Sequence, residues 1–333
     1  MSYSDSPVGD VQFTSPDVGW AVSNSSLHRT PDAGVSWQRI SDVGGVRSIC
    51  VVNDESGFAV GQRFGDPAIL ATHEVGDSWT TTSQLPDRFL PQDVFFADRM
   101  VGWIGGTRDG VAGIARTDDG EESWSLVRLN VSFVCYCVRF FGDSGYAVLS
   151  NEAMQHSSGV PEQDIRELAH RKWNELGCPS NKDERLWLEA EAELNSSVVC
   201  HSQDGGHSWE ILHTFDREFL WWVSAVSSRV AWLGGRKLFS NVSGDWQSFD
   251  QPGVGAFTCE NRGIIGWPTH GRIARTSDTG KSWSTAGVGV NGVRALSYRD
   301  ALSVYAATGN LGAGSTIVTP QDGGASWETL ANI

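Results

Sequence analysis

The octapeptide SQDGGHSW at residues 202–209 belongs to a set of seven related segments, each closed by a Trp. The Trp residues are 37 to 45 residues apart, except for one gap of 85. Repetition at a fixed period of this length is typical of repeat architectures. The other six segments are TPDAGVSW (30–37), THEVGDSW (72–79), TDDGEESW (117–124), SNVSGDW (240–246), TSDTGKSW (276–283) and PQDGGASW (320–327).

The chemistry of these boxes favours a turn over a ligand site. An Asp carboxylate accepts hydrogen bonds from nearby backbone N–H groups, and Gly supplies a position with φ above zero. Because the repeats use these residues in the same way, we expect a structural role for them. They are Asp32, Trp37, Trp79, Asp119, Trp124, Asp204, Trp209, Trp246, Asp278, Trp283, Asp322 and Trp327.

A second motif precedes the boxes and completes the repeat. It reads GWAV (19–22), GFAVG (57–61) and GWIGG (102–106) in the first three units, and a further apolar run lies before each. Every unit therefore offers four short strands separated by Gly/Asp turns. The pattern predicts an all-β fold: one seven-bladed β-propeller over residues 1–333, with four-stranded antiparallel blades and a helical insertion in blade four.

The box and the strand before it resemble the Asp-box (BNR) repeat family. The spelling is most similar to propellers of the photosystem II stability and assembly factor kind, and more distantly to sialidase- and sortilin-type propellers. Arg29–Thr30, Arg116–Thr117 and Arg275–Thr276 carry the resemblance just before the box. The resemblance implies a scaffold or assembly factor that binds a partner. It also implies that the inner strands line a central channel.

Composition narrows the class of partner. The net charge of −15 argues against a nucleic-acid surface, and no run of about 20 apolar residues predicts a membrane span. The first ten residues, MSYSDSPVGD, do not resemble a secretory signal, and the six cysteines form no CxxC pair. We expect free, buried thiols, a cytoplasmic location and a monomer.

The long gap between boxes contains a predicted helical insertion at residues 151–197. Apolar residues at helical spacing follow Pro161, and Gly177 ends the first segment. A second helix is expected after Asp183, so the insertion reads as a helical hairpin over the propeller face. It is interpreted either as a partner-docking element, through Trp173, Trp187 and Arg171, or as a structural lid.

The starts of the inner strands form a second candidate partner site. Alignment on the G-aromatic motif places Arg47, Gln92, Trp221 and Arg294 at one equivalent position, with Asp10, Ser48, Asp93 and Trp222 following. Arginines and a Trp at a channel mouth can hold a carboxylate or a peptide terminus. The alternative is that Arg47 and Arg294 pair with Asp10 and Asp93 as a polar lining.

Enzyme signatures are weak in this sequence. No R-I-P segment of sialidases occurs, no HExxH metal motif is present, and the glycines follow Asp in the manner of turns. Two carboxylates, Asp10 and Asp93, leave a glycoside hydrolase as an alternative. We therefore expect a non-catalytic protein- or peptide-binding scaffold without cofactor or metal. A carbohydrate-active or sugar-binding propeller is the alternative.

Overall fold

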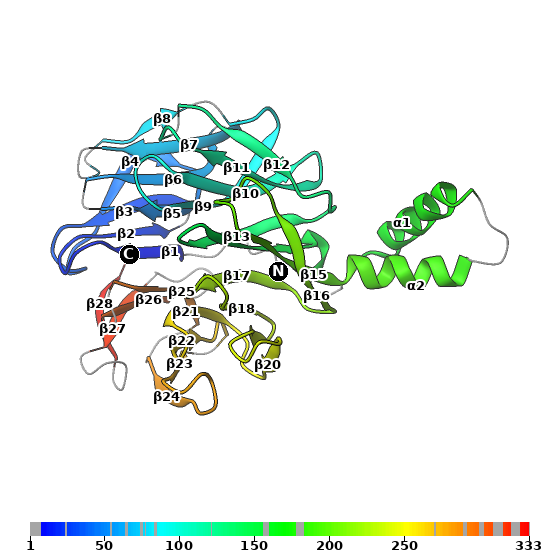
Figure 1. Cartoon of the computed structure of the whole chain (residues 1–333). Coiled ribbons are helices and arrows are strands. Elements are labelled where there is room, and N and C mark those ends of the chain that lie inside the picture. Colours follow the sequence, from blue (N-terminus) through cyan, green and yellow to red (C-terminus); the bar gives the residue numbers. More distant parts are fainter. Residues whose placement is uncertain are drawn as a thin grey trace.

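The structure is a computed structural model, and the described part of the chain forms seven four-stranded antiparallel sheets. Each sheet is built from four consecutive strands, and the sheets are arranged around a common centre (Figure 1). The predicted all-β propeller of four-stranded antiparallel blades is confirmed. The residues described are 8–23, 25–53, 55–63, 66–73, 76, 78–82, 85–120, 122–155, 160–177, 183–269, 271–288, 292–299, 303–308, 316–320 and 327–332.

The strands follow the chain from the centre of the ring outward in every sheet. The first three sheets are β1 (Val8–Phe13), β2 (Gly19–Ser23), β3 (Ser26–Thr30), β4 (Gln38–Gly44); β5 (Val46–Val51), β6 (Gly57–Arg63), β7 (Asp66–Thr72), β8 (Thr80–Thr82); and β9 (Phe89–Phe96), β10 (Gly102–Arg108), β11 (Val111–Thr117), β12 (Ser125–Arg128). The next two are β13 (Val134–Phe141), β14 (Ser144–Ser150), β15 (Ser196–Ser202), β16 (Glu210–Asp216); and β17 (Leu220–Ala225), β18 (Ala231–Gly235), β19 (Leu238–Ser240), β20 (Gln247–Phe249). The last two are β21 (Val254–Cys259), β22 (Arg262–Gly266), β23 (Arg272–Thr276), β24 (Ser284–Gly287); and β25 (Val293–Tyr298), β26 (Val304–Thr308), β27 (Thr316–Pro320), β28 (Trp327–Asn332).

The ring closes through side chains and not through a shared strand. Each inner strand contacts the next one along the chain, and β1 contacts β25 to complete the circle. At that closure the rings of Phe13 and Tyr305 stack with their centroids 3.5 Å apart. Val11 and Ala295 belong to the same buried cluster. Apolar packing between the first and last sheets therefore holds the ring shut.

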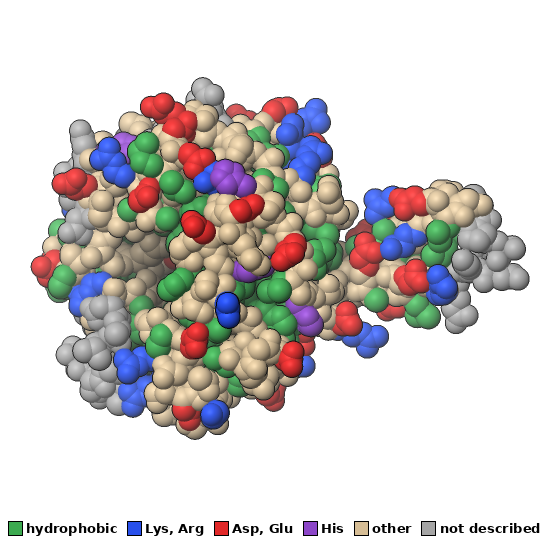
Figure 2. Space-filling view, in the orientation of Figure 1, with side chains coloured by type: hydrophobic (Ala, Val, Ile, Leu, Met, Phe, Trp, Pro, Cys, Tyr) green, Lys and Arg blue, Asp and Glu red, His purple; other side chains and the backbone are tan. Residues whose placement is uncertain are grey.

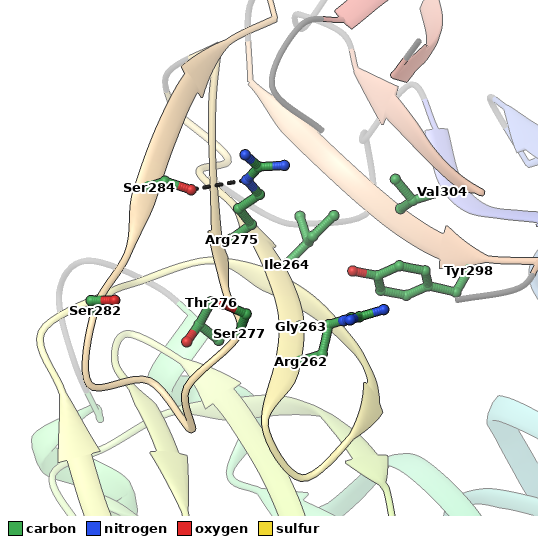
Figure 3. Close-up of a pocket in the computed structure, with 10 residues that line it drawn as sticks. All are labelled: Arg262, Gly263, Ile264, Arg275, Thr276, Ser277, Ser282, Ser284, Tyr298 and Val304. Carbon is green, nitrogen blue, oxygen red and sulfur yellow. Dashed lines mark hydrogen bonds between the residues drawn. The ribbon is translucent and has the colours of Figure 1, made fainter. Parts of the chain in front are cut away.

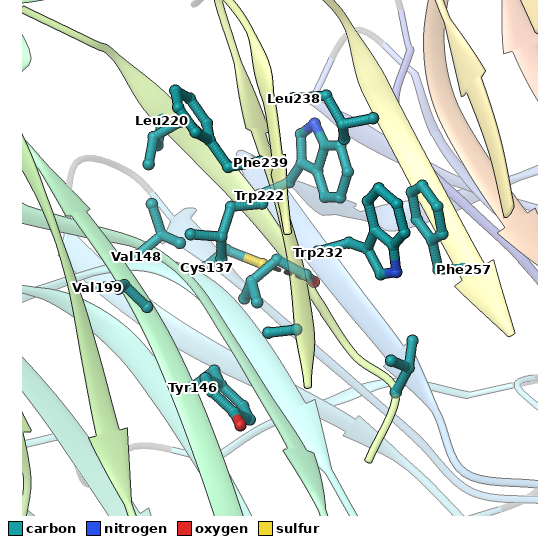
Figure 4. Close-up of a cluster of buried hydrophobic side chains, with 14 of the residues drawn as sticks. Cys137, Tyr146, Val148, Val199, Leu220, Trp222, Trp232, Leu238, Phe239 and Phe257 are labelled. Carbon is teal, nitrogen blue, oxygen red and sulfur yellow. Dashed lines mark hydrogen bonds between the residues drawn. The ribbon is translucent and has the colours of Figure 1, made fainter. Parts of the chain in front are cut away.

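The hydrophobic core lies between neighbouring sheets, as it must where each sheet has two faces to cover. The largest cluster joins the fourth, fifth and sixth sheets (Figure 4). Within it Trp232 stacks on Phe257 at 4.1 Å between centroids, and Trp222 donates a hydrogen bond to the carbonyl of Gly253 at 2.6 Å. The G-aromatic motif thus supplies the packing between sheets, because Trp232 comes from the second strand of its sheet.

The box turns share one hydrogen-bond pattern in the four motifs where the Asp is described. In the fourth box, Asp204 accepts bonds from the Ser202 hydroxyl, the Ser208 backbone N–H and the Ser208 hydroxyl. These three donors stabilise the charged carboxylate and hold the pKa of Asp204 well below its usual range. The same contacts recur at Asp32, Asp119 and Asp278. Asp322 lies outside the described residues.

Departures from the box spelling change the bond made by the closing Trp. Trp37, Trp209 and Trp283 each donate their indole N–H to the carbonyl of the box glycine, at 3.0 to 3.2 Å. In the third box the Gly is shifted, and the indole N–H of Trp124 has no partner among the described residues. The indole N–H of Trp79 also has no partner among the described residues although Gly76 stands in the regular place, so the position of the Gly alone does not decide whether this bond forms.

The predicted helical insertion is present between β14 and β15. A 3-10 turn, η2 (Glu152–Gln155), precedes α1 (Glu162–Glu175), which begins after Pro161, and α2 (Asp183–Leu194) follows. The expectation that the hairpin lies over the propeller face is wrong, because Figure 1 shows it extending beyond the outline of the sheets. Its base packs on the propeller, and acidic and basic side chains are interspersed along it (Figure 2).

The structure bears on the expectations about membrane-spanning segments and about the cysteines. In the described part of the chain, no helix is long and apolar enough to cross a membrane. Cys50, Cys135, Cys137 and Cys200 are free and buried as expected. Cys259 is free but exposed, which corrects the expectation of buried thiols. It is the last residue of β21, beside the turn into β22, and its thiol donates to the amide oxygen of Asn261 at 3.1 Å.

Candidate functional site: the channel mouth

A β-bulge recurs at the start of the inner strands and decides which side chains reach the channel mouth. The extra residue stands four positions before the one that pairs with the start of the G-aromatic motif. Bulges at rims re-aim a side chain away from the regular alternation. The bulged residues are Gly9, Arg47, Gln92, Tyr136, Trp221 and Arg294. In the sixth sheet Gly253 stands at the corresponding place, directly before β21.

The strand register places the four aligned residues at equivalent positions and adds a fifth residue that the alignment did not include. Arg47, Gln92, Trp221 and Arg294 share the bulge position. Tyr136 is their equivalent in the fourth sheet. The run CVRFF (137–141) offers two Phe residues as the one that pairs with the motif, and only the register to Gly145 settles the choice.

These bulges open on a cavity of about 1140 Å³ that follows the inner strands. All five bulged side chains line it, together with Glu152 of the insertion and Phe219. A ligand site of this kind is concave, with polar groups at a few places. The cavity is large enough for an extended peptide segment.

Deeper in the channel, side chains of one inner strand bind the backbone of the next. Asp10 accepts a hydrogen bond from the N–H of Ile49 at 3.2 Å, and Asp93 accepts one from the N–H of Val138 at 2.8 Å. The hydroxyl of Ser48 lies between the two carboxylates, 2.9 Å from Asp93 and 3.4 Å from Asp10. The carboxylates therefore tie neighbouring inner strands together.

The expected pairing of Arg47 and Arg294 with these carboxylates is wrong. Asp93 is paired instead with Arg139, at 2.5 Å, and Arg47 donates to the amide oxygen of Gln92 at 2.9 Å. Arg139 was missed because it lies three residues beyond the bulge, inside the apolar-looking run of β13. Its charge compensates Asp93, which is only 5% exposed.

Burial raises the pKa of Asp10 to about 6, although the nearby charge of Arg139 and the bond from the Ile49 N–H act in the opposite direction. Asp10 is half-buried in the channel wall and lies close to Asp93. A carboxyl with a raised pKa beside an ion-paired one is a pattern that acid–base catalysis uses. Apart from a bond from the adjacent Val11 N–H to Asp10, the hydrogen bonds and the ion pair of these two carboxylates join neighbouring inner strands.

The predicted docking residues of the insertion do not line the channel cavity. Arg171 is exposed on α1, and Trp173 is half-buried with its ring stacked on His170 at 5.7 Å. Trp187 is half-buried against the base of the hairpin. Leu186, the neighbour of Trp187 on α2, is buried with only 1% of it exposed, so it is not part of an exposed apolar surface.

A second cavity, of about 420 Å³, lies between the sixth and seventh sheets (Figure 3). Arg262, Arg275 and Tyr298 line it, and Arg275 donates to the hydroxyl of Ser284 at 2.9 Å. At the joint between the third and fourth sheets, Arg116 donates to the carbonyl of Gly205 in the next box turn. Arg275 stands directly before the first residue of its box, at the position that Arg116 has in the third sheet. The box turn of the seventh sheet, residues 321–326, lies outside the described residues. We assign this cavity to the joint between sheets.

Comparison with known proteins adds one sequence match. The family "Protein of unknown function (DUF2934)" matches residues 162–196, which are α1, α2 and the connection into β15. No curated protein has a significant sequence match to the chain. The part of the chain that is similar to this family is therefore the helical hairpin.

Solved structures show the similarity of fold. YCF48 bound to D1 peptide superposes with a TM-score of 0.62 at 16% identity, covering 92% of this chain and 91% of that one. YCF48 from Cyanidioschyzon merolae gives 0.57 at 12%, covering 91% and 92%. The GH74 xyloglucanase from Xanthomonas campestris gives 0.65 at 14%, covering 97% of this chain and 54% of the enzyme. At these identities the comparisons establish the propeller fold alone.

Proposed function

We propose that this protein is a non-catalytic propeller of the Asp-box kind that binds a peptide segment of a partner at its channel mouth. The observation that carries the proposal is the recurring bulge, which brings Arg47, Gln92, Tyr136, Trp221 and Arg294 to one cavity. Aromatic and Arg side chains dominate binding energy in protein interfaces. The likeness in fold to YCF48 bound to a peptide supports the same assignment.

Selection from a displayed random peptide library, followed by fluorescence anisotropy with resynthesised peptides, tests this proposal. Trp221→Ala and Arg294→Ala are each expected to weaken binding about tenfold or more, as hot-spot truncations do. Val35→Ala is the matched control, because Val35 is 72% exposed on a box turn. Failure to select any peptide, or equal losses for Val35→Ala and Trp221→Ala, would contradict a site at the mouth.

A carbohydrate-active propeller is the second candidate. It is favoured by the raised pKa of Asp10, the neighbouring Asp93 and the likeness in fold to a xyloglucanase. Against it stands the use of both carboxylates in bonding between strands. Release of reducing ends from xyloglucan by the wild type, lost in Asp10→Asn, would establish this second function in place of the first.

The proposal also includes a cytoplasmic monomer. The five described cysteines are free, as cysteines are in reducing compartments. Light scattering on the purified chain checks the monomer, and fractionation of the native host checks the location. A stable dimer would require revision of the partner stoichiometry but not of the mouth site.

A further inference from the structure

The channel mouth has two arcs of different chemistry. Going around the ring, the seventh, second and third sheets contribute Arg294, Arg47 and Gln92, whereas the fourth and fifth contribute Tyr136 and Trp221. The equivalent positions in the first and sixth sheets are Gly9 and Gly253, which have no side chain. Gly9 stands between Arg294 and Arg47, and Gly253 stands between Trp221 and Arg294. One arc is polar and cationic, and the other is aromatic.

The aromatic arc is backed by the base of the helical hairpin. Phe219, which is 3% exposed, lies against Tyr136 at 5.4 Å and against Trp221 at 5.6 Å between ring centroids. Buried side chains of the insertion pack on these three rings in one cluster: Met154, Val160, Ile165, Leu168, Ala190 and Leu194. The insertion therefore forms the back of this half of the mouth.

The insertion is fixed to the fifth sheet as well as to its own. Ser150 and Ser197, at the two ends of the insertion, are bonded to each other at 2.6 Å. The Ser150 hydroxyl donates to the carbonyl of Leu220 at 2.6 Å, just before Trp221. A guanidinium N–H of Arg236 also donates to the carbonyl of Met154 at 3.0 Å. Movement of the hairpin base would therefore move the aromatic arc with it.

The polar arc has a hydrogen-bond donor group, the guanidinium of Arg294, that is not fully used within the described part of the chain. The Nε of Arg294 is shielded from solvent and has no hydrogen-bond acceptor among the described residues. A donor left without an acceptor is destabilising, and a carboxylate that pairs with the Arg294 guanidinium would supply an acceptor on this arc. In a chain of net charge −15, the cationic arc is a local exception suited to an anionic group.

We propose that the mouth recognises an extended peptide at two points: a carboxylate on the Arg47–Arg294 arc and an aromatic side chain on the Tyr136–Trp221 arc. In this arrangement the hairpin insertion is the positioning element for the aromatic preference. The inference rests on the proposed peptide-binding function and adds the chemistry of the peptide. Trp221 and Tyr136 contact the ligand, whereas Ile165 and Leu168 act through them.

The test uses the peptides selected above and three matched analogues of each, with the aromatic residue changed to Ala, the acidic residue changed to its amide, or the C-terminus amidated. Against the wild-type chain, the Ala analogue and one of the two carboxylate analogues are expected to bind at least about tenfold more weakly. Which carboxylate analogue loses binding tells a side-chain carboxylate from a chain terminus.

Protein variants then separate the two arcs. Ile165→Ala and Leu168→Ala should reduce discrimination against the Ala analogue at least threefold and leave discrimination against the carboxylate analogue unchanged. Arg294→Gln should do the reverse. Leu188→Ala, at a position that is 56% exposed on α2, should change neither. If Ile165→Ala melts the hairpin, the same loss of aromatic discrimination is expected, because the arc then loses its backing.

Equal weakening of all peptides by Ile165→Ala would overturn the role of the hairpin while leaving peptide binding intact. Selected peptides that lack either an aromatic or an acidic group would overturn the two-point chemistry. Recovery of no peptide at all would instead overturn the proposed function itself, so the failures are distinguishable.

Discussion

The carboxylate of Asp93 on β9 accepts a hydrogen bond at 2.8 Å from the backbone N–H of Val138 on β13, the inner strand of the next sheet. Asp10 does the same for Ile49, and the amide oxygen of Gln12 accepts the N–H of Val51. Inner strands leave one edge of backbone groups without a ladder partner, and such groups need acceptors when shielded from water. Side chains from the preceding sheet supply these acceptors, so the polar residues of the channel wall join the blades.

Replacement of Asp93 by Ala tests this joining role. The change removes the acceptor for Ser48 and Val138 and leaves the guanidinium of Arg139 without its partner. Breaking a shielded pair in this way is expected to lower the free energy of unfolding by about 3 kcal/mol, measured by urea denaturation. Asp250→Ala, at an exposed position on the outer rim, serves as control and should change it by under about 0.5 kcal/mol. Similar values for the two variants would show that the channel contacts do not hold the sheets.

A pH dependence follows from Asp10. Its pKa is about 6 in the folded chain against an ordinary value of 3.8, so the folded state holds a proton that the unfolded state has lost. The free energy of unfolding contributed by Asp10 is therefore full below about pH 4 and is lost as pH rises to about 6. The free energies of unfolding of the wild type and Asp10→Asn are compared by urea denaturation between pH 4 and 8. The advantage of the variant over the wild type should increase up to about pH 6 and stay constant above it. A difference that does not vary with pH would contradict the raised pKa.

The box glycines can be compared in a matched pair. Gly206 has φ +89°, and a Cβ there would meet Trp103 Nε1 at 2.4 Å. Gly244 has φ +99° with open space around it. Both Ala variants carry the cost of a left-handed backbone, but only Gly206→Ala also disturbs packing against the preceding sheet. Thermal melts should show the larger loss for Gly206→Ala, and equal losses would mean that the turn does not lock the sheets.

The sequence predicts those parts of the fold that depend on residues close together in the chain, and not those that depend on contacts between distant residues. The box spacing and the G-aromatic motif predict the four-stranded units, because turn residues and strand periodicity are local. The ends of α1, at Pro161 and before Gly177, are predicted for the same reason. Ring closure by Phe13 and Tyr305 is not predicted, since those residues lie at opposite ends of the chain.

The site is predicted less completely. Equivalence of Arg47 and Arg294 is visible in the repeat, whereas Tyr136 is hidden by the double Phe that follows it. The ion pair between Asp93 and Arg139 is not predicted, because both residues lie within strand patterns and belong to different sheets. The burial of Leu186 is not predicted, because helical spacing identifies the apolar face of a helix but not the residues that cover that face.

Removal of the insertion is the broadest test of its relation to the fold. Ser150 and Ser197 are paired across β14 and β15, so deletion of 151–196 and insertion of Asn-Gly would join them by a two-residue hairpin turn. The shortened chain is expected to fold cooperatively, because apart from Ser196, the first residue of β15, the strands of the seven sheets lie outside the deleted residues. Its far-UV circular dichroism should lose the helical signal.

The deletion should nevertheless lower the free energy of unfolding by about 2–3 kcal/mol, because Phe219, now 3% exposed, loses its cover. Phe219→Thr in the deleted chain is the matched variant: it removes the newly exposed ring and should restore solubility if aggregation follows the deletion. Cooperative melting of either shortened chain supports the hairpin as an addition to a complete ring. Failure of both to melt cooperatively would mean instead that the insertion is required to assemble the fourth and fifth sheets, and that its base is part of the core.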